Sequence, residues 1–218
     1  MPPPTRMPPE YNSDAFDRLE KALQPLAPHR EHRAIATCLN GSAYRFRSAL
    51  AADDQYRAEL KNPSGDRYIE DTAFSHFCYD WLSSVECFCM AVYHVAATKN
   101  STAFPTDTKG MKVYAPDIAA RFKLHFVWTK LTSELNRLVG APEYSQLKVY
   151  RDALAHRQVL ARQMNAGGPR SADLIPSNPK DHPADWKFDT PLGGVTVQPR
   201  KFLIAWMSDA LEAALQFV

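Results

Sequence analysis

The sequence contains no long apolar segment of the kind that a membrane-spanning helix requires. Its longest apolar stretch, Val85–Ala97, is shorter than the roughly 20 residues that cross a bilayer, and Glu86 and His94 interrupt it. The opening residues 1–9 are rich in proline and contain no apolar core of the kind found in a signal peptide. We therefore expect a cytoplasmic protein that has no membrane partner.

The sequence also lacks the residue spacings of common metal and phosphate sites. It has four cysteines, Cys38, Cys78, Cys87 and Cys89. Cys87 and Cys89 are close together in sequence, but there is no second pair at such a spacing. This spacing argues against a structural zinc site and favours free, buried thiols in a reducing cytosol. The chain has no glycine-rich phosphate loop, no His-Glu-x-x-His and no Glu-x-x-His. We expect neither a bound metal nor a cofactor.

The charge of the chain excludes few classes of partner. Its 218 residues carry a formal net charge of +2, and 45% of them are hydrophobic, which is ordinary for a soluble globular protein. This charge permits an anionic partner without requiring one, because dedicated nucleic-acid-binding proteins are usually more basic. The length is sufficient for one domain with a core of its own.

Apolar residues recur at steps of three and four along most of the chain, which predicts an all-α bundle of five to six helices. We expect a disordered, proline-rich tail at 1–12 and a single helical domain at 13–218. The predicted helices are one capped by Ser13 or Asp14, one from Arg30 to about Ala52, one from Glu70 to about Thr98, one from Pro116 to Gly140, one that begins at Pro142 and ends by Gly167, and a last one from Pro199.

The segments between these helices carry weaker signals. The polar residues 53–67 predict a connection. Two alternating stretches, 186–190 and 195–197, flank a Leu-Gly-Gly turn and predict a short β-hairpin before the last helix. Gly41 is expected to weaken the middle of the second helix.

Several other residues have ordinary structural interpretations. His76 and His94 lie five helical turns apart, so they cannot share a metal without help from other helices. The basic residues of the second predicted helix could guide RNA, although a charged stretch is more often a solvated helix face. Core packing is expected of three tryptophans at helical spacing, which are Trp81, Trp128 and Trp206.

The residues that carry chemistry lie in the segment 150–157, where an arginine, a carboxylate and a histidine fall within two helical turns. Asp152 and His156 are four residues apart and therefore share a helix face, with Arg151 on its flank. Asp152 could orient the imidazole of His156, which would then act as acid or base near neutral pH. The guanidinium of Arg151 could hold a phosphate that gains charge, and Arg157 adds a second cation. These groups suffice to cut a phosphodiester without a metal.

The same residues resemble the motif of the HEPN superfamily, the higher eukaryotes and prokaryotes nucleotide-binding domains. That motif is an arginine, a polar residue, three further positions and a histidine, in a late helix of a four- or five-helix bundle with one more helix behind it. Arg151, Asp152 and His156 match these positions, and a further helix is predicted from Pro199. The architectural resemblance covers roughly residues 70–218. The polar position is often asparagine in active members, whereas this chain has aspartate.

The resemblance implies a metal-independent endoribonuclease, of the kind that acts as a toxin or in defence. In such families two copies of the chain pair, so that both motif helices face one cleft. Arg151 and His156 would be catalytic with Asp152 in support, Arg157 would bind substrate, and the substrate would be RNA because the reaction needs a 2′-hydroxyl. The implied partners are a second copy of the chain and an antitoxin or a nucleotidyltransferase-type protein.

Two alternatives remain open at this point. The chain could be a non-catalytic HEPN-like module for dimerisation, nucleotide binding or adaptor function, which the aspartate and the modest net charge favour. It could also be a helical protein unrelated to the superfamily, in which case its helix order would differ.

Overall fold

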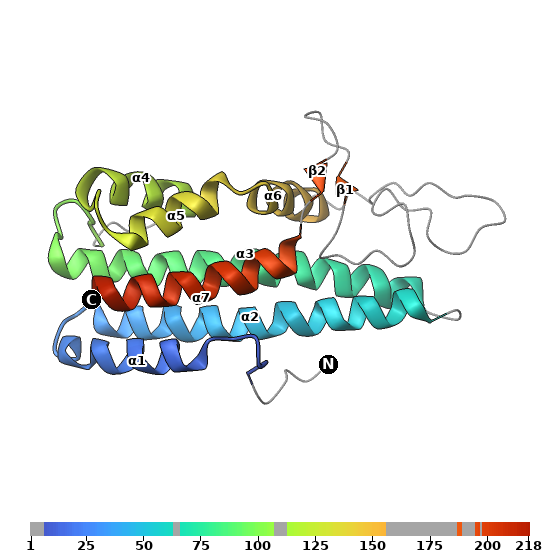
Figure 1. The fold of residues 1–218 in the computed structure, drawn as a ribbon, viewed down its shortest axis with the longest axis horizontal. Coiled ribbons are helices and arrows are strands. Elements are labelled where there is room, and N and C mark those ends of the chain that lie inside the picture. The colour runs from blue at the N-terminus through green and yellow to red at the C-terminus, as the bar shows by residue number, and fades with distance from the viewer. Residues whose placement is uncertain (1–6, 63–65, 107–112, 156–186, 189–194, 197) are drawn as a thin grey trace. The chain divides into compact units, whose positions relative to one another are not determined.

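The computed structural model describes residues 7–62, 66–106, 113–155, 187–188, 195–196 and 198–218. In this part of the chain the protein is an all-α helical bundle, as predicted (Figure 1). Its elements are α1 (Ser13–Leu23), the 3₁₀ turn η1 (Gln24–Leu26), α2 (His32–Lys61), α3 (Arg67–Lys99), α4 (Ala115–His125), α5 (Lys130–Gly140), α6 (Pro142–Ala155), β1 (Lys187–Phe188), β2 (Val195–Thr196) and α7 (Pro199–Phe217).

Several predicted boundaries agree with the structure. The third predicted helix corresponds to α3, and the fifth begins at Pro142 as α6 does. The two strands form an antiparallel pair at the predicted place, with Lys187 opposite Thr196 and Phe188 opposite Val195. The predicted continuation of the fifth helix beyond Ala155 lies outside the described residues.

The second helix is longer than the sequence predicted. The polar residues after Ala52 were expected to form a connection, but α2 continues to Lys61. Asp53 and Arg57 are four residues apart within this extension, and their side chains form an ion pair. The prediction of a connection was wrong because oppositely charged side chains four residues apart pair with each other along a helix and stabilise it.

The fourth predicted helix is two helices. The expected span from Pro116 to Gly140 is interrupted after α4, and α5 begins at Lys130. The hydroxyl groups of Thr129 and Thr132 both donate to the carbonyl of Phe126, at 3.1 and 2.7 Å. Two threonine hydroxyls and the backbone N–H of Thr129, at 3.1 Å, therefore bind the carbonyl that a continuous helix would have bonded to the backbone four residues later.

The first helix has a different cap from the one predicted. The side chain of Asn12 accepts a hydrogen bond from the backbone of Ala15 at 3.0 Å, so Asn12 is the cap in place of Ser13 or Asp14. The preceding residue, Tyr11, is buried and its ring lies 5.0 Å from that of Phe46. Burial raises the pKa of this tyrosine above its usual value.

The chain forms two compact units, and α2, α3 and α7 contribute residues to both of them. Unit 1 takes its described residues from 47–82 and 141–203, and unit 2 takes them from 5–46, 83–140 and 204–218. The motif segment belongs to unit 1.

In unit 2 a pair of reciprocal hydrogen bonds joins α2 to α3. Ser42 in α2 donates to the carbonyl of Ser84 in α3 at 2.9 Å, and Ser84 donates back to the carbonyl of Ser42 at 3.0 Å. Both serines are buried, and these reciprocal bonds satisfy their hydroxyl groups. Trp206 of α7 is fully buried in the same unit and donates to the carbonyl of Glu134 at 2.9 Å.

All four cysteines are free, as predicted. Cys78 and Cys89 are buried in α3, and Cys38 and Cys87 are half-buried. Burial raises the pKa of each thiol, which keeps it protonated and poorly nucleophilic at neutral pH.

Candidate functional site

Two of the predicted site residues, Arg151 and Asp152, lie at the end of α6, in unit 1. Arg151 and Asp152 belong to the last described turn of this helix. His156 and Arg157 follow directly and lie outside the described residues. The structure therefore brings together two of the four predicted residues, and the shared helix face of Asp152 and His156 stays a prediction.

Arg151 and Asp152 form an ion pair with each other. Two guanidinium nitrogens of Arg151, Nε and Nη2, each lie 3.1 Å from Oδ1 of Asp152. The arginine side chain is 23% exposed and the aspartate side chain 52%. The carboxylate of Asp152 therefore partly neutralises the positive charge of Arg151.

Aromatic contacts within unit 1 hold the motif helix. The ring of Tyr150, directly before Arg151, meets Phe74 of α3 edge to face at 6.0 Å, and Phe74 in turn lies 5.9 Å from Tyr56 of α2. One helical turn and a half earlier, Tyr144 lies 6.5 Å from the buried ring of Trp81. These contacts fix the rotation of α6: Tyr144 and Leu147 are buried and Tyr150 is half-buried, whereas Lys148 and Val149 are exposed.

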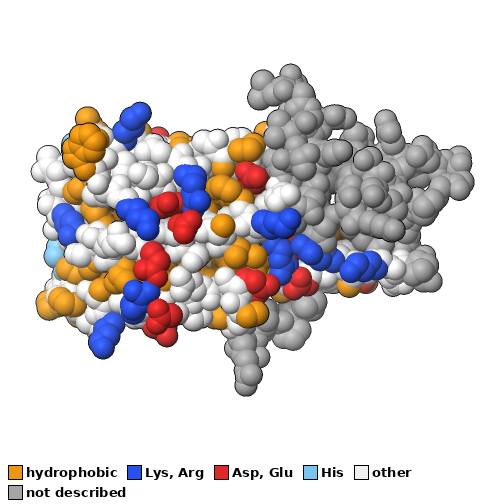
Figure 2. Space-filling model, viewed as in Figure 1, with side chains coloured by type: hydrophobic (Ala, Val, Ile, Leu, Met, Phe, Trp, Pro, Cys, Tyr) orange, Lys and Arg blue, Asp and Glu red, His pale blue; other side chains and the backbone are white. Residues whose placement is uncertain are grey.

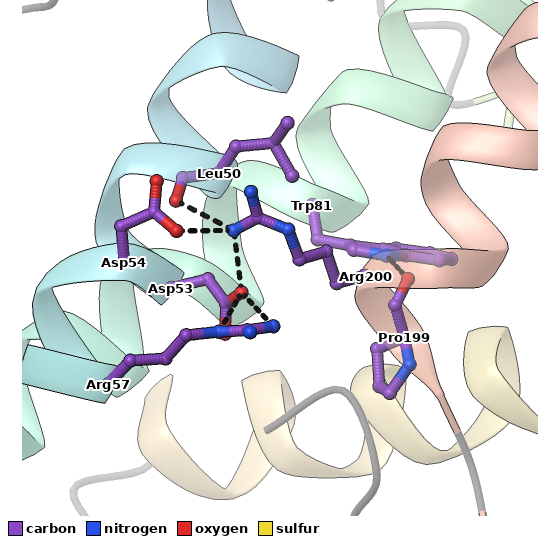
Figure 3. A network of polar contacts seen from close by, with 7 residues as sticks. All are labelled: Leu50, Asp53, Asp54, Arg57, Trp81, Pro199 and Arg200. Carbon is purple, nitrogen blue, oxygen red and sulfur yellow. Dashed lines mark hydrogen bonds and ion pairs between the residues drawn. The ribbon is translucent and has the colours of Figure 1, made fainter. Parts of the chain in front are cut away.

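A second polar cluster in unit 1 was not predicted from the sequence (Figure 3). Asp53 of α2 is completely buried. Oδ2 of its carboxylate accepts hydrogen bonds from Nη1 of Arg200 at 2.8 Å and from Nε of Arg57 at 3.1 Å. Arg200 also donates to Asp54 at 2.7 Å and to the carbonyl of Leu50 at 3.3 Å. We call Asp53, Asp54, Arg57 and Arg200 the arginine clamp.

In the arginine clamp, burial and the neighbouring charges shift the pKa of Asp53 in opposite directions. Burial raises the pKa of Asp53 above its usual range, and the two arginines partly counter that rise. Burial likewise lowers the pKa of Arg57. The clamp is a structural device that neutralises a buried carboxylate, and its arginines are committed to that task.

The arginine clamp fixes the place where the last helix begins. Arg200 is the second residue of α7, and the residue before it, Pro199, accepts a hydrogen bond from the indole of Trp81 at 2.8 Å (Figure 3). Both contacts lie at the first two residues of α7. The four-residue spacing of Asp53 and Arg57 could have indicated half of this cluster, but no local pattern connects Asp53 with Arg200.

The histidines of α3 do not form a metal site in the described part of the chain, where no group of three metal-binding side chains occurs. His94 instead pairs with Glu31 in unit 2, with Nδ1 lying 2.7 Å from Oε2 of the carboxylate. Thr106 donates to the other oxygen of Glu31 at 2.8 Å. This buried cluster joins the start of α2 to α3 and to the segment that follows α3.

Comparison with known proteins adds nothing to this picture: no protein-family model, no curated protein and no solved structure matches the chain. In the described residues no helix is long and apolar enough to cross a membrane.

Proposed function

We propose that the protein is a metal-independent endoribonuclease of HEPN type, in which Arg151 and His156 are catalytic. The observation that supports the proposal is the position of Arg151 and Asp152: they lie in the last described turn of α6 in an all-α bundle, and one long helix, α7, comes later in the sequence. Asp152 supports the two catalytic residues, and Arg157 binds the substrate. Two copies of the chain would complete one site.

The proposed reaction follows from the chemistry of these side chains. The imidazole of His156 takes a proton from the ribose 2′-hydroxyl or gives one to the departing 5′-oxygen. The oxygen of the 2′-hydroxyl attacks the adjacent phosphorus, so that one product ends in a 2′,3′-cyclic phosphate and the other begins with a 5′-hydroxyl. The guanidinium of Arg151 stabilises the phosphate as its negative charge increases.

The ion pair of Arg151 with Asp152 sets a condition on this reaction. The phosphate must share the guanidinium with the carboxylate or displace it, because both bind the same hydrogen-bond donors. The carboxylate of the pair is 52% exposed and the arginine 23%, and ion pairs near the surface contribute little energy, on the order of 1 kcal/mol or less. A phosphate can therefore compete with the carboxylate of Asp152 for the guanidinium.

The test is incubation of the purified protein with mixed RNA in the presence of a chelator. We expect the protein to cut RNA and to leave cyclic phosphate ends. DNA of the same sequence should not be cut. His156→Ala and Arg151→Ala should each slow cleavage by about a hundredfold or more. The matched control is Lys21→Ala, which removes an exposed cation from α1. Equal cleavage by His156→Ala and the unaltered protein, or no cleavage by either, would refute the proposal.

A second candidate function is a non-catalytic dimerisation, nucleotide-binding or adaptor module built on the same bundle. One observation favours it: the Asp152 carboxylate, 52% exposed, already engages the guanidinium that the nuclease needs. In that case the unaltered protein would form a dimer in analytical ultracentrifugation but leave RNA intact, and Asp152→Asn would not restore cleavage.

A further inference from the structure

The linker between α4 and α5 has a fixed conformation. The carbonyl of Phe126 accepts from the backbone of Thr129 at 3.1 Å and from the hydroxyl of Thr132 at 2.7 Å. The Thr129 hydroxyl lies 2.8 Å from that of Thr132. These bonds close a tight turn in unit 2 and define the direction in which the linker residues point.

The ring of Phe126 anchors this turn in the core of unit 2. It stacks on Phe104 at 5.5 Å and meets Phe217 of α7 edge to face at 4.9 Å, with Phe122 5.4 Å away. The side chain of Phe126 points inward, and the next two residues are displayed outward on a rigid base.

The side chains displayed there are apolar and strongly exposed. Trp128 is 96% exposed, Leu124 of α4 is 72% exposed and Val127 is 48% exposed. The expectation that Trp128 packs in the core was wrong, whereas Trp81 and Trp206 are fully buried as predicted. We call Leu124, Val127 and Trp128 the apolar tip. Exposed apolar side chains that are grouped together are typical of protein or membrane interaction sites.

The charged residues nearest to the apolar tip in sequence are basic, and the nearest carboxylates, Asp117 and Glu134, lie further away on either side. Residues 118–133 include Arg121, Lys123 and Lys130 and contain neither aspartate nor glutamate. Lys123 and Lys130, on either side of the tip in sequence, are both exposed. Hydrophobic side chains lie on the surface near α4 with Lys or Arg side chains close by (Figure 2). A body that covered the tip would therefore meet exposed apolar side chains flanked by lysines.

The size and form of the apolar tip favour a lipid bilayer over a protein as its partner. Three side chains fall well short of the roughly 800 Å² per partner that a stable protein interface buries, and two copies would bring their lysines together. Trp128 also touches almost nothing of its own chain, so it projects from the surface and does not line a groove. Projecting Trp and Leu side chains flanked by lysines suit the boundary of a lipid bilayer, where indole groups favour the headgroup level.

We propose that the apolar tip docks the protein on an anionic lipid bilayer, with Trp128 entering the interface and Lys123 and Lys130 contacting the headgroups. The contact is peripheral, so it needs no spanning helix. The expectation of no membrane partner rested on the lack of such a helix and does not bear on a peripheral contact. This inference is independent of the proposed nuclease activity.

The test is co-sedimentation of the full chain with vesicles of phosphatidylcholine alone and with added phosphatidylglycerol. We expect binding to the anionic vesicles, a weakening with salt, and a blue shift of tryptophan emission that Trp128→Phe removes. Trp128→Ala should lower the partition coefficient about tenfold or more, since a buried large side chain contributes that much. The double variant Lys123→Glu with Lys130→Glu should abolish binding.

The control is Tyr68→Ala, which removes a 77% exposed aromatic side chain from unit 1 and should leave vesicle binding unchanged. Circular dichroism confirms that the variants fold, which the exposure of these side chains leads us to expect. The proposal is overturned if the folded protein ignores anionic vesicles, binds neutral ones equally well, or binds them equally after Trp128→Ala. A change of oligomeric state in Trp128→Ala without vesicle binding would assign the tip to a second copy or another protein instead.

Discussion

Arg200 at the start of α7 lies 2.8 Å from the buried carboxylate of Asp53 in α2. The Asp53 side chain has no exposed surface and that of Arg200 is 12% exposed, so this ion pair is largely shielded from water. Arg57 contacts the same carboxylate but is 33% exposed. Arg200 is therefore the more important of the two partners for keeping Asp53 charged inside unit 1.

Arg200→Ala should lower the free energy of unfolding by about 3 kcal/mol, because it leaves the Asp53 carboxylate buried with only one arginine. Urea denaturation followed by circular dichroism measures this change. The matched control is Asp54→Ala, which removes the 64% exposed partner of Arg200 and should cost less than about 1 kcal/mol. Equal losses for both variants would show that the buried ion pair contributes nothing beyond a surface contact.

The arginine clamp illustrates which parts of the fold the sequence could predict. Helical periodicity depends on neighbours three and four residues apart, so it predicted the bundle, α3 and the start of α6. The contact of Asp53 with Arg200 joins residues that are 147 positions apart. No local pattern contains that information. The residues after Ala52 were interpreted as a connection because they are polar, although the four-residue spacing of Asp53 and Arg57 fits a helix.

The linker after α4 shows a second limit of periodicity. Phe122, Phe126 and Leu131 continue one apolar stripe, and this stripe predicted one uninterrupted helix. The threonine hydroxyls that capture the Phe126 carbonyl end α4 and turn Trp128 outward. Of the candidate site, spacing placed Arg151 and Asp152 correctly on α6, but it could not reveal that they pair with each other.

Gly41→Ala should raise the free energy of unfolding by about 0.5–1 kcal/mol, the ordinary gain for this change inside a helix. Gly41 lies within α2, and a Cβ atom there would lie 3.5 Å from Sγ of Cys87, which is ordinary van der Waals contact. Thermal or urea denaturation measures the gain. Gly41→Val is the contrasting variant, since its branched side chain would crowd Cys87. A loss of stability on Gly41→Ala would mean that this close approach tolerates no side chain.

Glu31→Gln should destabilise unit 2 at neutral pH and reduce the loss of stability in acid. Burial alone would raise the pKa of Glu31, but hydrogen bonds from Thr106 and His94 and nearby positive charge lower it below its usual value of 4.5. The folded protein therefore holds fewer protons than the unfolded chain in acid. The stabilisation is complete above pH 4.5 and is lost as the pH falls through the folded pKa.

The expected loss at pH 7 is about 1–2 kcal/mol, the contribution of charged hydrogen bonds in a mostly buried site. Urea titrations at several pH values between about 3 and 7 measure it, and the difference between Glu31→Gln and the unaltered protein should shrink toward the acid end. Glu10→Gln, an exposed carboxylate in the same unit, is the control. A difference that stays constant with pH would show that the charge of Glu31 has no role.

Arg151→Lys should separate the charge of this residue from its planar shape, within the proposed nuclease mechanism. Lysine keeps the positive charge but lacks the two parallel donors with which a guanidinium grips phosphate oxygens. Because Arg151 is proposed to act as charge builds in the transition state, the substitution should lower kcat by about tenfold and change KM little. Steady-state kinetics on a short RNA measures both constants.

Lys148→Ala provides the comparison on the same helix, since Lys148 is an exposed cation one turn before Arg151. If it contributes only general attraction for RNA, it should raise KM, leave kcat unchanged and lose its effect at high salt. The effect of Arg151→Lys on kcat should persist at high salt, because the geometry of the donors is unaffected by screening. A purely KM effect of Arg151→Lys that salt removes would reduce Arg151 to an RNA-binding residue and leave His156 without its proposed catalytic partner.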